Sequence, residues 1–334
     1  MTITATSISR SNSYTDGIAL MCGALICFAC LDASAKWLNH YMEPMQTVFL
    51  RYAISLIFVT ALLNPAASGH HFKTNRPWLQ VSRSLMLLLA TMLNIIALQY
   101  LQLAETMSIM FTTPFFVALL AGPLLGEWIS LQRLGAVVVG FLGVLLVVRP
   151  GTGELHPYAA FSVVGAICYA LYNLATRFLA AHDSSETTMF YSGLVGTCLS
   201  LPFIPFIWST PPSPVVWIVV LLIGGFGAAG HWLLILAHRR APASVLAPFI
   251  FTEIIWMIAL GYLLFGDLPD RYTLSGALIV ILAGLYLLYV ERNGQARWLP
   301  HGRGKADVSS RRVSDVGQHS LQRPVGHHKI KRAQ

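Results

Sequence analysis

Five polar or charged side chains interrupt long apolar stretches of the chain: Asp32, Arg51, Asn94, His231 and Glu253. A charge at the centre of a membrane helix costs about 2.5 to 3.5 kcal/mol on insertion scales, so Glu253 must face a partner, face a cavity or be protonated. One use for such a carboxyl is to take up and release a proton, with His231 as a second relay. A hydrogen bond to a neighbouring helix is the structural alternative.

The polar residues nearer the N-terminus also allow two interpretations. Asp32 and Lys36 are one helical turn apart and can form, with Arg51, a charge cluster that locks two helix ends. Alternatively, Asp32 and Arg51 belong to an outer gate or bind a polar group of a solute, with Asn94 as a further hydrogen-bond partner.

Aromatic residues and prolines accompany these polar positions. Pro114 and Pro248 lie inside apolar stretches, where a proline frees a carbonyl and acts either as a hinge or as a fixed kink. We expect most of the aromatic residues to be core and a few, Trp256 among them, to line a pocket for a planar solute. The aromatic set is Phe111, Phe115, Phe116, Tyr169, Tyr172, Phe249, Phe251 and Trp256.

Membrane-spanning helices must position all these residues. Hydrophobic residues make up 55% of the 334 residues and charged residues 11%, whereas about 25% charged is typical of soluble domains. Stretches of about 20 apolar residues are long enough to cross a bilayer. The sequence therefore predicts an all-α membrane protein of ten transmembrane helices, at about 17–37, 46–64, 79–99, 104–125, 133–149, 158–178, 187–208, 215–236, 243–264 and 273–290.

The chain also repeats itself. Moving residues 17–150 by 140 or 141 positions onto 158–291 aligns Cys27-Phe28-Ala29 with Cys168-Tyr169-Ala170 and Gly143 with Gly284. Because each half has an odd number of helices, the second half enters the membrane from the opposite side. Inverted repeats of this kind place the solute site between them.

Comparison of the two halves distinguishes polar residues with a structural role from candidates for the functional site. Polar groups present in both halves, Lys36 with Arg177 and Glu127 with Asp267, lie at helix ends and are expected to be structural. The five candidates have chemically different counterparts: Asp32 aligns with Asn173, Arg51 with Ser192, Asn94 with Leu234, His231 with Thr91, and Glu253 with Thr113.

Charge and composition divide the chain. We expect a cytoplasmic segment at 1–15, repeats at 16–150 and 157–291, and a tail at 292–334. The first apolar stretch is too long for a signal-peptide core. The tail carries ten Lys and Arg residues against two acids, which accounts for the net charge of +8. It lacks interleaved aromatics, so disorder beside anionic lipid is favoured over nucleic-acid binding. Loop cations place both termini in the cytoplasm.

Several motifs resemble the EamA repeats of the drug/metabolite transporter superfamily, over about residues 15–292. The resemblance implies a ten-helix carrier of two inverted five-helix repeats in a bacterial inner membrane. Its second half is similar to riboflavin importers and S-adenosylmethionine uptake carriers, and aromatics beside hydrogen-bonding groups favour riboflavin. The motifs are Leu103-Ala104-Glu105-Thr106, Leu125-Gly126-Glu127, Gly230-His231, Ala247-Pro248-Phe249 and Phe265-Gly266-Asp267.

Other functions remain as alternatives. The same fold would serve an exporter or importer of amino acids or S-adenosylmethionine-like metabolites, or a receptor without transport. An intramembrane enzyme is disfavoured because the sequence has neither H-E-x-x-H nor G-x-S-x-G. We expect no cofactor and no metal site, and Cys27-x-x-Cys30 lies inside an apolar span, where packing is the expected role.

Overall fold

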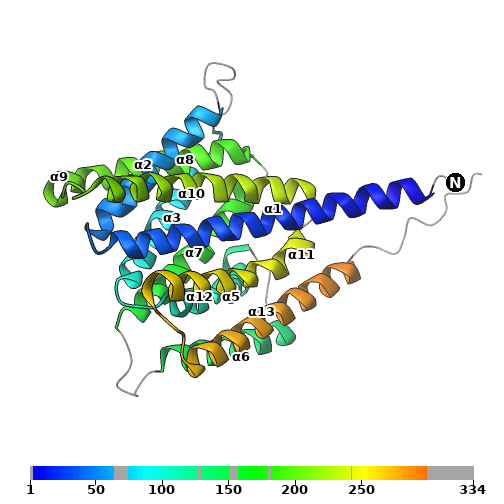
Figure 1. Cartoon of the computed structure of the whole chain (residues 1–334). Helices are drawn as coiled ribbons and strands as arrows, with labels where there is room; N and C mark the ends of the chain where they lie inside the picture. The colour runs from blue at the N-terminus through cyan, green and yellow to red at the C-terminus, as the bar shows by residue number, and fades with distance from the viewer. Residues whose placement is uncertain are drawn as a thin grey trace, which may run out of the picture. The chain divides into compact units, whose positions relative to one another are not determined.

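The chain is built from helices throughout the part that the computed structural model describes, which is residues 3–63, 74–125, 130–149, 157–179, 182–241 and 243–298 (Figure 1). Ten spans in this part are long and apolar enough to cross a membrane, which confirms the prediction. The elements are α1 (Ile3–Leu38), α2 (Pro44–Leu63), α3 (Pro77–Leu98), α4 (Leu103–Met110), α5 (Thr113–Leu125), α6 (Leu131–Val148), α7 (Ala159–Leu179), α8 (Ser185–Ser200), η2 (Leu201–Phe203), α9 (Ile204–Ile207), α10 (Pro214–Arg240), α11 (Ala243–Leu246), η3 (Ala247–Thr252), α12 (Glu253–Phe265) and α13 (Arg271–Trp298).

Helix packing follows the inverted repeat. Helix α1 packs along α10, and α3 packs along α7. In the repeat alignment α1 corresponds to α7 and α3 to α10, so the two contacts are equivalent: each joins the first helix of one repeat to the third helix of the other. The contacts of α5 with α7 and of α12 with α1 are equivalent in the same way. The helices α2 and α8, which correspond to each other, pack together. The predicted architecture of two inverted five-helix repeats is thus confirmed.

The fourth and ninth spans are broken at corresponding places. The fourth span stops at Met110 and resumes as α5 at Thr113, and the ninth passes from η3 into α12 at Glu253. Hydroxyl groups satisfy some of the freed carbonyls: Thr113 Oγ1 donates to Met110 O over 2.7 Å, and Thr252 Oγ1 donates to Phe249 O over 2.7 Å. Backbone that departs from a helix at membrane depth is tolerated only inside protein or beside a cavity.

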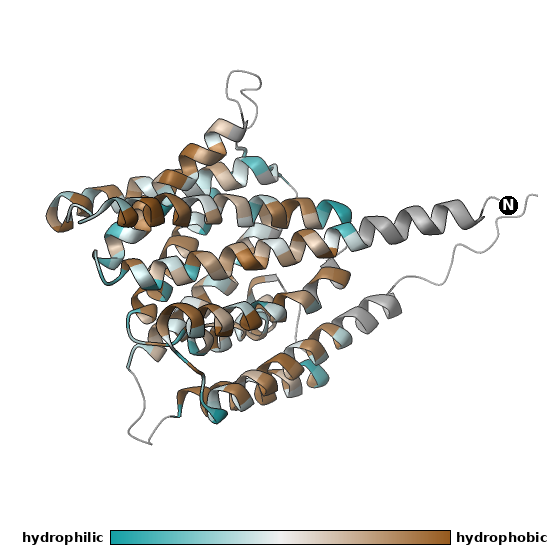
Figure 2. Cartoon of the chain, in the orientation of Figure 1, coloured by the Kyte–Doolittle hydropathy of each residue, from teal (hydrophilic) through white to brown (hydrophobic). Residues whose placement is uncertain are grey.

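Hydrophobic residues predominate along the helices of the bundle (Figure 2). Side chains such as Leu142 and Leu263 are 57% and 73% exposed, as suits a protein whose solvent is lipid. Helix α13 continues past the repeat boundary expected at 291 to Trp298. The remainder of the predicted basic tail, and Glu127, lie outside the described residues.

Helices α6 and α13 meet through glycines. A Cβ atom added to Gly276 would lie 2.6 Å from the carbonyl oxygen of Gly143, whereas one added to Gly135 would meet nothing within 4 Å. Small residues at a membrane helix interface let the two backbones approach closely. This contact joins the last helix of each repeat.

We predict that Gly276→Ala destabilises the bundle while Gly135→Ala leaves it unchanged. The added methyl group at Gly276 must push a backbone carbonyl away, and such overpacking costs roughly 1 to 3 kcal/mol. Thermal unfolding of both variants in the same detergent provides the measurement. Equal melting temperatures for the two variants would contradict the glycine contact.

Candidate functional site

A cavity of about 370 Å3 lies between the repeats, and its lining comes from helices of both. It falls within the 300–1,000 Å3 typical of small-molecule sites. The structure places all five polar candidates in its wall: Asp32, Arg51, Asn94, His231 and Glu253.

The repeat counterparts of these residues line the same space. Asn173, Leu234, Thr91 and Thr113 belong to the cavity wall, and Ser192 lines a smaller cavity beside it. The pseudo-twofold axis that relates the repeats therefore passes through the cavity. Each of the five candidates lies across that axis from a residue of different chemistry.

The polar groups of the cavity have few protein partners. Asn94 Nδ2 donates to Asp32 Oδ1 over 3.2 Å, and Arg51 Nη1 donates to Thr91 Oγ1 over 2.9 Å. Glu253 is 7% exposed, and its side chain makes no hydrogen bond or ion pair within the described residues. Neither Asp32 nor Arg51 lies within 4.0 Å of an opposite charge in that part of the chain. The cavity thus holds two carboxyl groups and a guanidinium that form no ion pair within 4.0 Å among the described residues.

His231 is placed by an aromatic neighbour. Its ring meets that of Phe28 edge to face, with centroids 5.1 Å apart. Phe28 was not among the expected aromatics, yet it lines the cavity, as do Phe111, Tyr169 and Phe251. These rings surround the polar groups with apolar surface.

The predicted cluster of Asp32, Lys36 and Arg51 is wrong. Lys36 Nζ lies 2.6 Å from Asp267 Oδ2, donates to Leu101 O over 3.0 Å and stands over the Phe265 ring. The cause is the end of α12, where Gly266 adopts a φ of 70° and turns the chain so that Asp267 faces the last turn of α1. Lys36 therefore joins the two repeats and leaves Asp32 free for the cavity.

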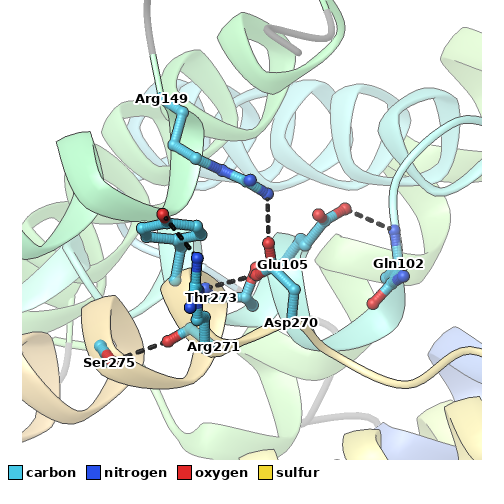
Figure 3. A network of polar contacts seen from close by, with 8 residues as sticks. Gln102, Glu105, Arg149, Asp270, Arg271, Thr273 and Ser275 are labelled. Carbon is cyan, nitrogen blue, oxygen red and sulfur yellow. Dashed lines mark hydrogen bonds and ion pairs between the residues drawn. The ribbon is translucent and has the colours of Figure 1, made fainter. Parts of the chain in front are cut away.

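A second ion pair joins the repeats at the same connection. Arg149 Nη2 lies 2.8 Å from Asp270 Oδ2, and the same carboxyl accepts a hydrogen bond from Thr273 N over 2.8 Å (Figure 3). Burial alone would raise the pKa of Asp270, but the Thr273 hydrogen bond and the Arg149 charge together hold it below its usual value. Two cations of the first repeat thus hold the α12–α13 connection of the second.

The cavity is open at one end and closed at the other. Exposed His238 lines it near the end of α10, where Arg240 also pairs with Asp16 over 3.0 Å. At the opposite end, buried Leu98 and Leu101 and the Lys36–Asp267 pair lie beyond the last lining residues. Among the described residues, the cavity is therefore more accessible from the side on which α10 ends.

Two sequence candidates lie outside the cavity wall, which includes Pro114 but not Pro248. The Pro248 side chain is exposed. Trp256 is 38% exposed and absent from the cavity lining. Trp256 follows Glu253 by three residues, which is only about 60° around the helix, yet its side chain does not reach the cavity lining.

Sequence reasoning missed Arg83. This residue is 3% exposed in the middle of the bundle, and its guanidinium contacts α7 and α8. The repeat test could have found it, because the offset of 140 that aligns Thr91 with His231 aligns Arg83 with Ile223. It is therefore a sixth charged or polar position that the second half does not share.

Ten helices in two inverted repeats, enclosing a polar cavity, define a membrane carrier of small solutes. The EamA-like transporter family model matches residues 15–149 and 156–290, and the chain belongs to this family. It is a transporter of small metabolites.

Curated relatives align over nearly their whole length. The chain is 27% identical to an S-adenosylmethionine uptake transporter of Rickettsia felis over 85% of this chain and 96% of that one. It is 25% identical to a riboflavin transporter of Vibrio cholerae (84% and 95%) and 26% identical to a pseudopaline exporter of Pseudomonas aeruginosa (81% and 95%). A solved crystal structure with 18% identity covers 85% of this chain and 99% of its own, at a TM-score of 0.60, and shows the same fold.

The cavity wall can be tested by its access to water. We predict that Asn173→Cys, in a background without the native cysteines, reacts with a water-soluble maleimide supplied at the α10 C-terminal side. Trp256→Cys should react at least several-fold more slowly, because it lies outside the cavity lining. Mass spectrometry of labelled membranes measures both rates, and similar rates at the two positions would contradict the assignment.

Proposed function

We propose that this chain is a secondary carrier that works by alternating access and takes up a zwitterionic, S-adenosylmethionine-like metabolite. The observation that carries the proposal is that Asp32, Glu253 and Arg51 line one cavity and none of them forms an ion pair among the described residues. Charged groups buried without a partner are costly in a membrane. A solute that brings the missing charges offsets that cost.

S-adenosylmethionine carries groups complementary to each part of the wall. Its ammonium and sulfonium groups are cations for Asp32 and Glu253, and its carboxylate is an anion for Arg51. Its adenine is a planar ring for the aromatic side chains, among them Phe111 and Tyr169. The similarity to uptake transporters for this metabolite supports the same choice.

Riboflavin is the second candidate. The aromatic lining suits an isoalloxazine ring, and Asn94 and Arg51 suit the hydroxyl groups of a ribityl chain. Riboflavin is uncharged near neutral pH, however, so it would leave Asp32 and Glu253 without cations. Charge complementarity therefore favours the zwitterion.

Alternating access needs a gate at each end of the cavity, and the two gates must open in turn. The pairs Lys36–Asp267 and Arg149–Asp270 close one end here, and the broken fourth and ninth spans, with Pro114 and Pro248 at the breaks, supply the hinges. In the orientation that we propose, both termini lie on the cytoplasmic side of a bacterial inner membrane, and the open end of the cavity faces the cytoplasm. Opening outward would require both ion pairs to separate.

We predict that proteoliposomes containing the chain take up labelled S-adenosylmethionine saturably, and that excess riboflavin competes weakly. Empty liposomes are the control, and counterflow from preloaded vesicles separates transport from binding. Riboflavin uptake without S-adenosylmethionine uptake would replace the first candidate by the second. Binding of either solute without movement would identify a receptor.

We also predict that Glu253→Gln abolishes pH-driven accumulation and retains counterflow at a weaker apparent affinity, because Asp32 and Arg51 still bind the solute. The amide keeps the shape of the side chain but cannot take up and release a proton, so net coupling is lost while solute exchange continues. Glu43→Gln, at an exposed position between α1 and α2, is the matched control. Unchanged pH-driven accumulation in Glu253→Gln would remove the proton role.

A further inference from the structure

A smaller cavity of about 50 Å3 adjoins the large one and differs from it in charge. Arg51, Leu87 and His231 line both cavities, so the two spaces share a wall. The small cavity adds Arg83 and the polar side chains Ser55, Tyr172 and Ser192. It holds two guanidinium groups and no carboxyl group among its lining residues.

Arg83 has neutral partners only. Its Nε donates to Thr176 Oγ1 over 2.7 Å, Nη1 donates to Ser192 Oγ over 2.8 Å and to Thr188 O over 3.2 Å, and Nη2 donates to Tyr172 Oη over 2.8 Å. A guanidinium has five N–H donors, so these four bonds leave one donor. No acid lies within 4.0 Å of Arg83 in the described part of the chain.

These bonds position the group without neutralising it. Hydroxyl and carbonyl acceptors fix the guanidinium against α7 and α8, but its positive charge stays uncompensated at a site that is 3% exposed. The Tyr172 ring, whose centroid lies 4.4 Å from Arg83 Cζ, adds a cation–π contact but no negative charge. A buried cation held rigidly at the edge of a cavity is arranged to receive an anion.

The shape of the small cavity restricts that anion. A space of about 50 Å3 exceeds what one water needs, roughly 10 to 15 Å3, and is far too small for a nucleoside. Guanidinium groups recognise carboxylates through charge-assisted hydrogen bonds; Arg83 has one donor left for such a bond, and Arg51 lies in the same wall. The cavity thus suits a carboxylate group attached to a larger molecule in the adjoining space.

We propose that the small cavity is the carboxylate subsite of the transported solute, with Arg83 and Arg51 as its binding residues. This proposal rests on the proposed function: the cationic groups of the solute face Asp32 and Glu253, and its carboxylate enters between the two arginines. Arg51 lines both cavities and marks the junction. The carrier then selects solutes with a free carboxylate and separated positive charge.

Decarboxylated S-adenosylmethionine tests the subsite, because it keeps the sulfonium, ammonium and adenosine groups and lacks only the carboxylate. The wild-type chain should prefer the intact metabolite by about 10- to 100-fold in apparent affinity, the range for a charged hydrogen-bonded contact. Arg83→Gln should lose most of that preference. Arg76→Gln, exposed at the start of the same helix, should keep it.

A purely structural role for Arg83 predicts a different pattern. If it only ties α3 to α7 and α8, Arg83→Gln lowers the melting temperature but keeps the wild-type preference for the carboxylate, and the subsite is overturned. If Arg83→Gln fails to fold, Arg83→Lys replaces it as the test, because it keeps the positive charge but lacks the planar guanidinium. Its preference should fall several-fold, and an undiminished preference there overturns the subsite.

A second measurement separates failure of the subsite from failure of the proposed function. Sodium formate, compared with sodium chloride at equal ionic strength, should raise the melting temperature of the purified wild-type chain and not that of Arg83→Lys. If S-adenosylmethionine is not transported but formate stabilises only the wild type, the substrate assignment fails and the anion site stands. If formate stabilises neither chain, the anion site fails whatever the transported solute is.

Discussion

The cost of an isolated charge in hydrocarbon governs where this chain can place its ionic groups. At the rim, the charges are paired across the repeats, as in Lys36 with Asp267 and Arg149 with Asp270. Along the axis between the repeats, Asp32 and Glu253 form no ion pair among the described residues. Buried charges of this kind are costly in a membrane, which is why we propose that the solute brings the countercharge.

The duplication determines where equivalent positions lie around the cavity, and the differences between the two repeats determine which side chains occupy them. The inverted repeat places equivalent positions on opposite sides of the cavity, so a symmetric protein would present the same wall twice. Here Asp32 lies opposite Asn173 in the repeat, and Arg51 opposite Ser192. The cavity consequently has acidic and basic regions, and a solute with separated charges can bind in only one orientation.

The helix count and the cavity residues were predictable, because they follow from the length of the apolar stretches and from the internal repeat of the sequence. Ten spans follow from apolar length, and the five candidates around the cavity follow from the repeat alignment. The partner of Lys36 was not predictable, because it depends on how the turn at Gly266 aims Asp267 at a helix far away in sequence. The orientation of Trp256 depends on where α12 begins, and that start lies at a break within an apolar stretch.

Arg83 was missed for a different reason: it lies near the start of a span, where long cations usually extend to the membrane surface. Its side chain instead points inward, because Thr176 and Ser192 offer acceptors on the facing helices.

Uncompensated groups on the axis also constrain the transport cycle. In the proposed cycle, solute binding brings an opposite charge close to each charged group of the cavity, so closure around the complex buries fewer isolated charges. An empty cavity leaves the carboxyls of Asp32 and Glu253 exposed to a low-dielectric wall, which makes closure unfavourable unless they take up protons or another cation. In the proposed cycle, the charge pattern that selects the solute therefore also prevents the empty carrier from returning freely, and we expect the chain to exchange one solute for another or to couple its return to an ion.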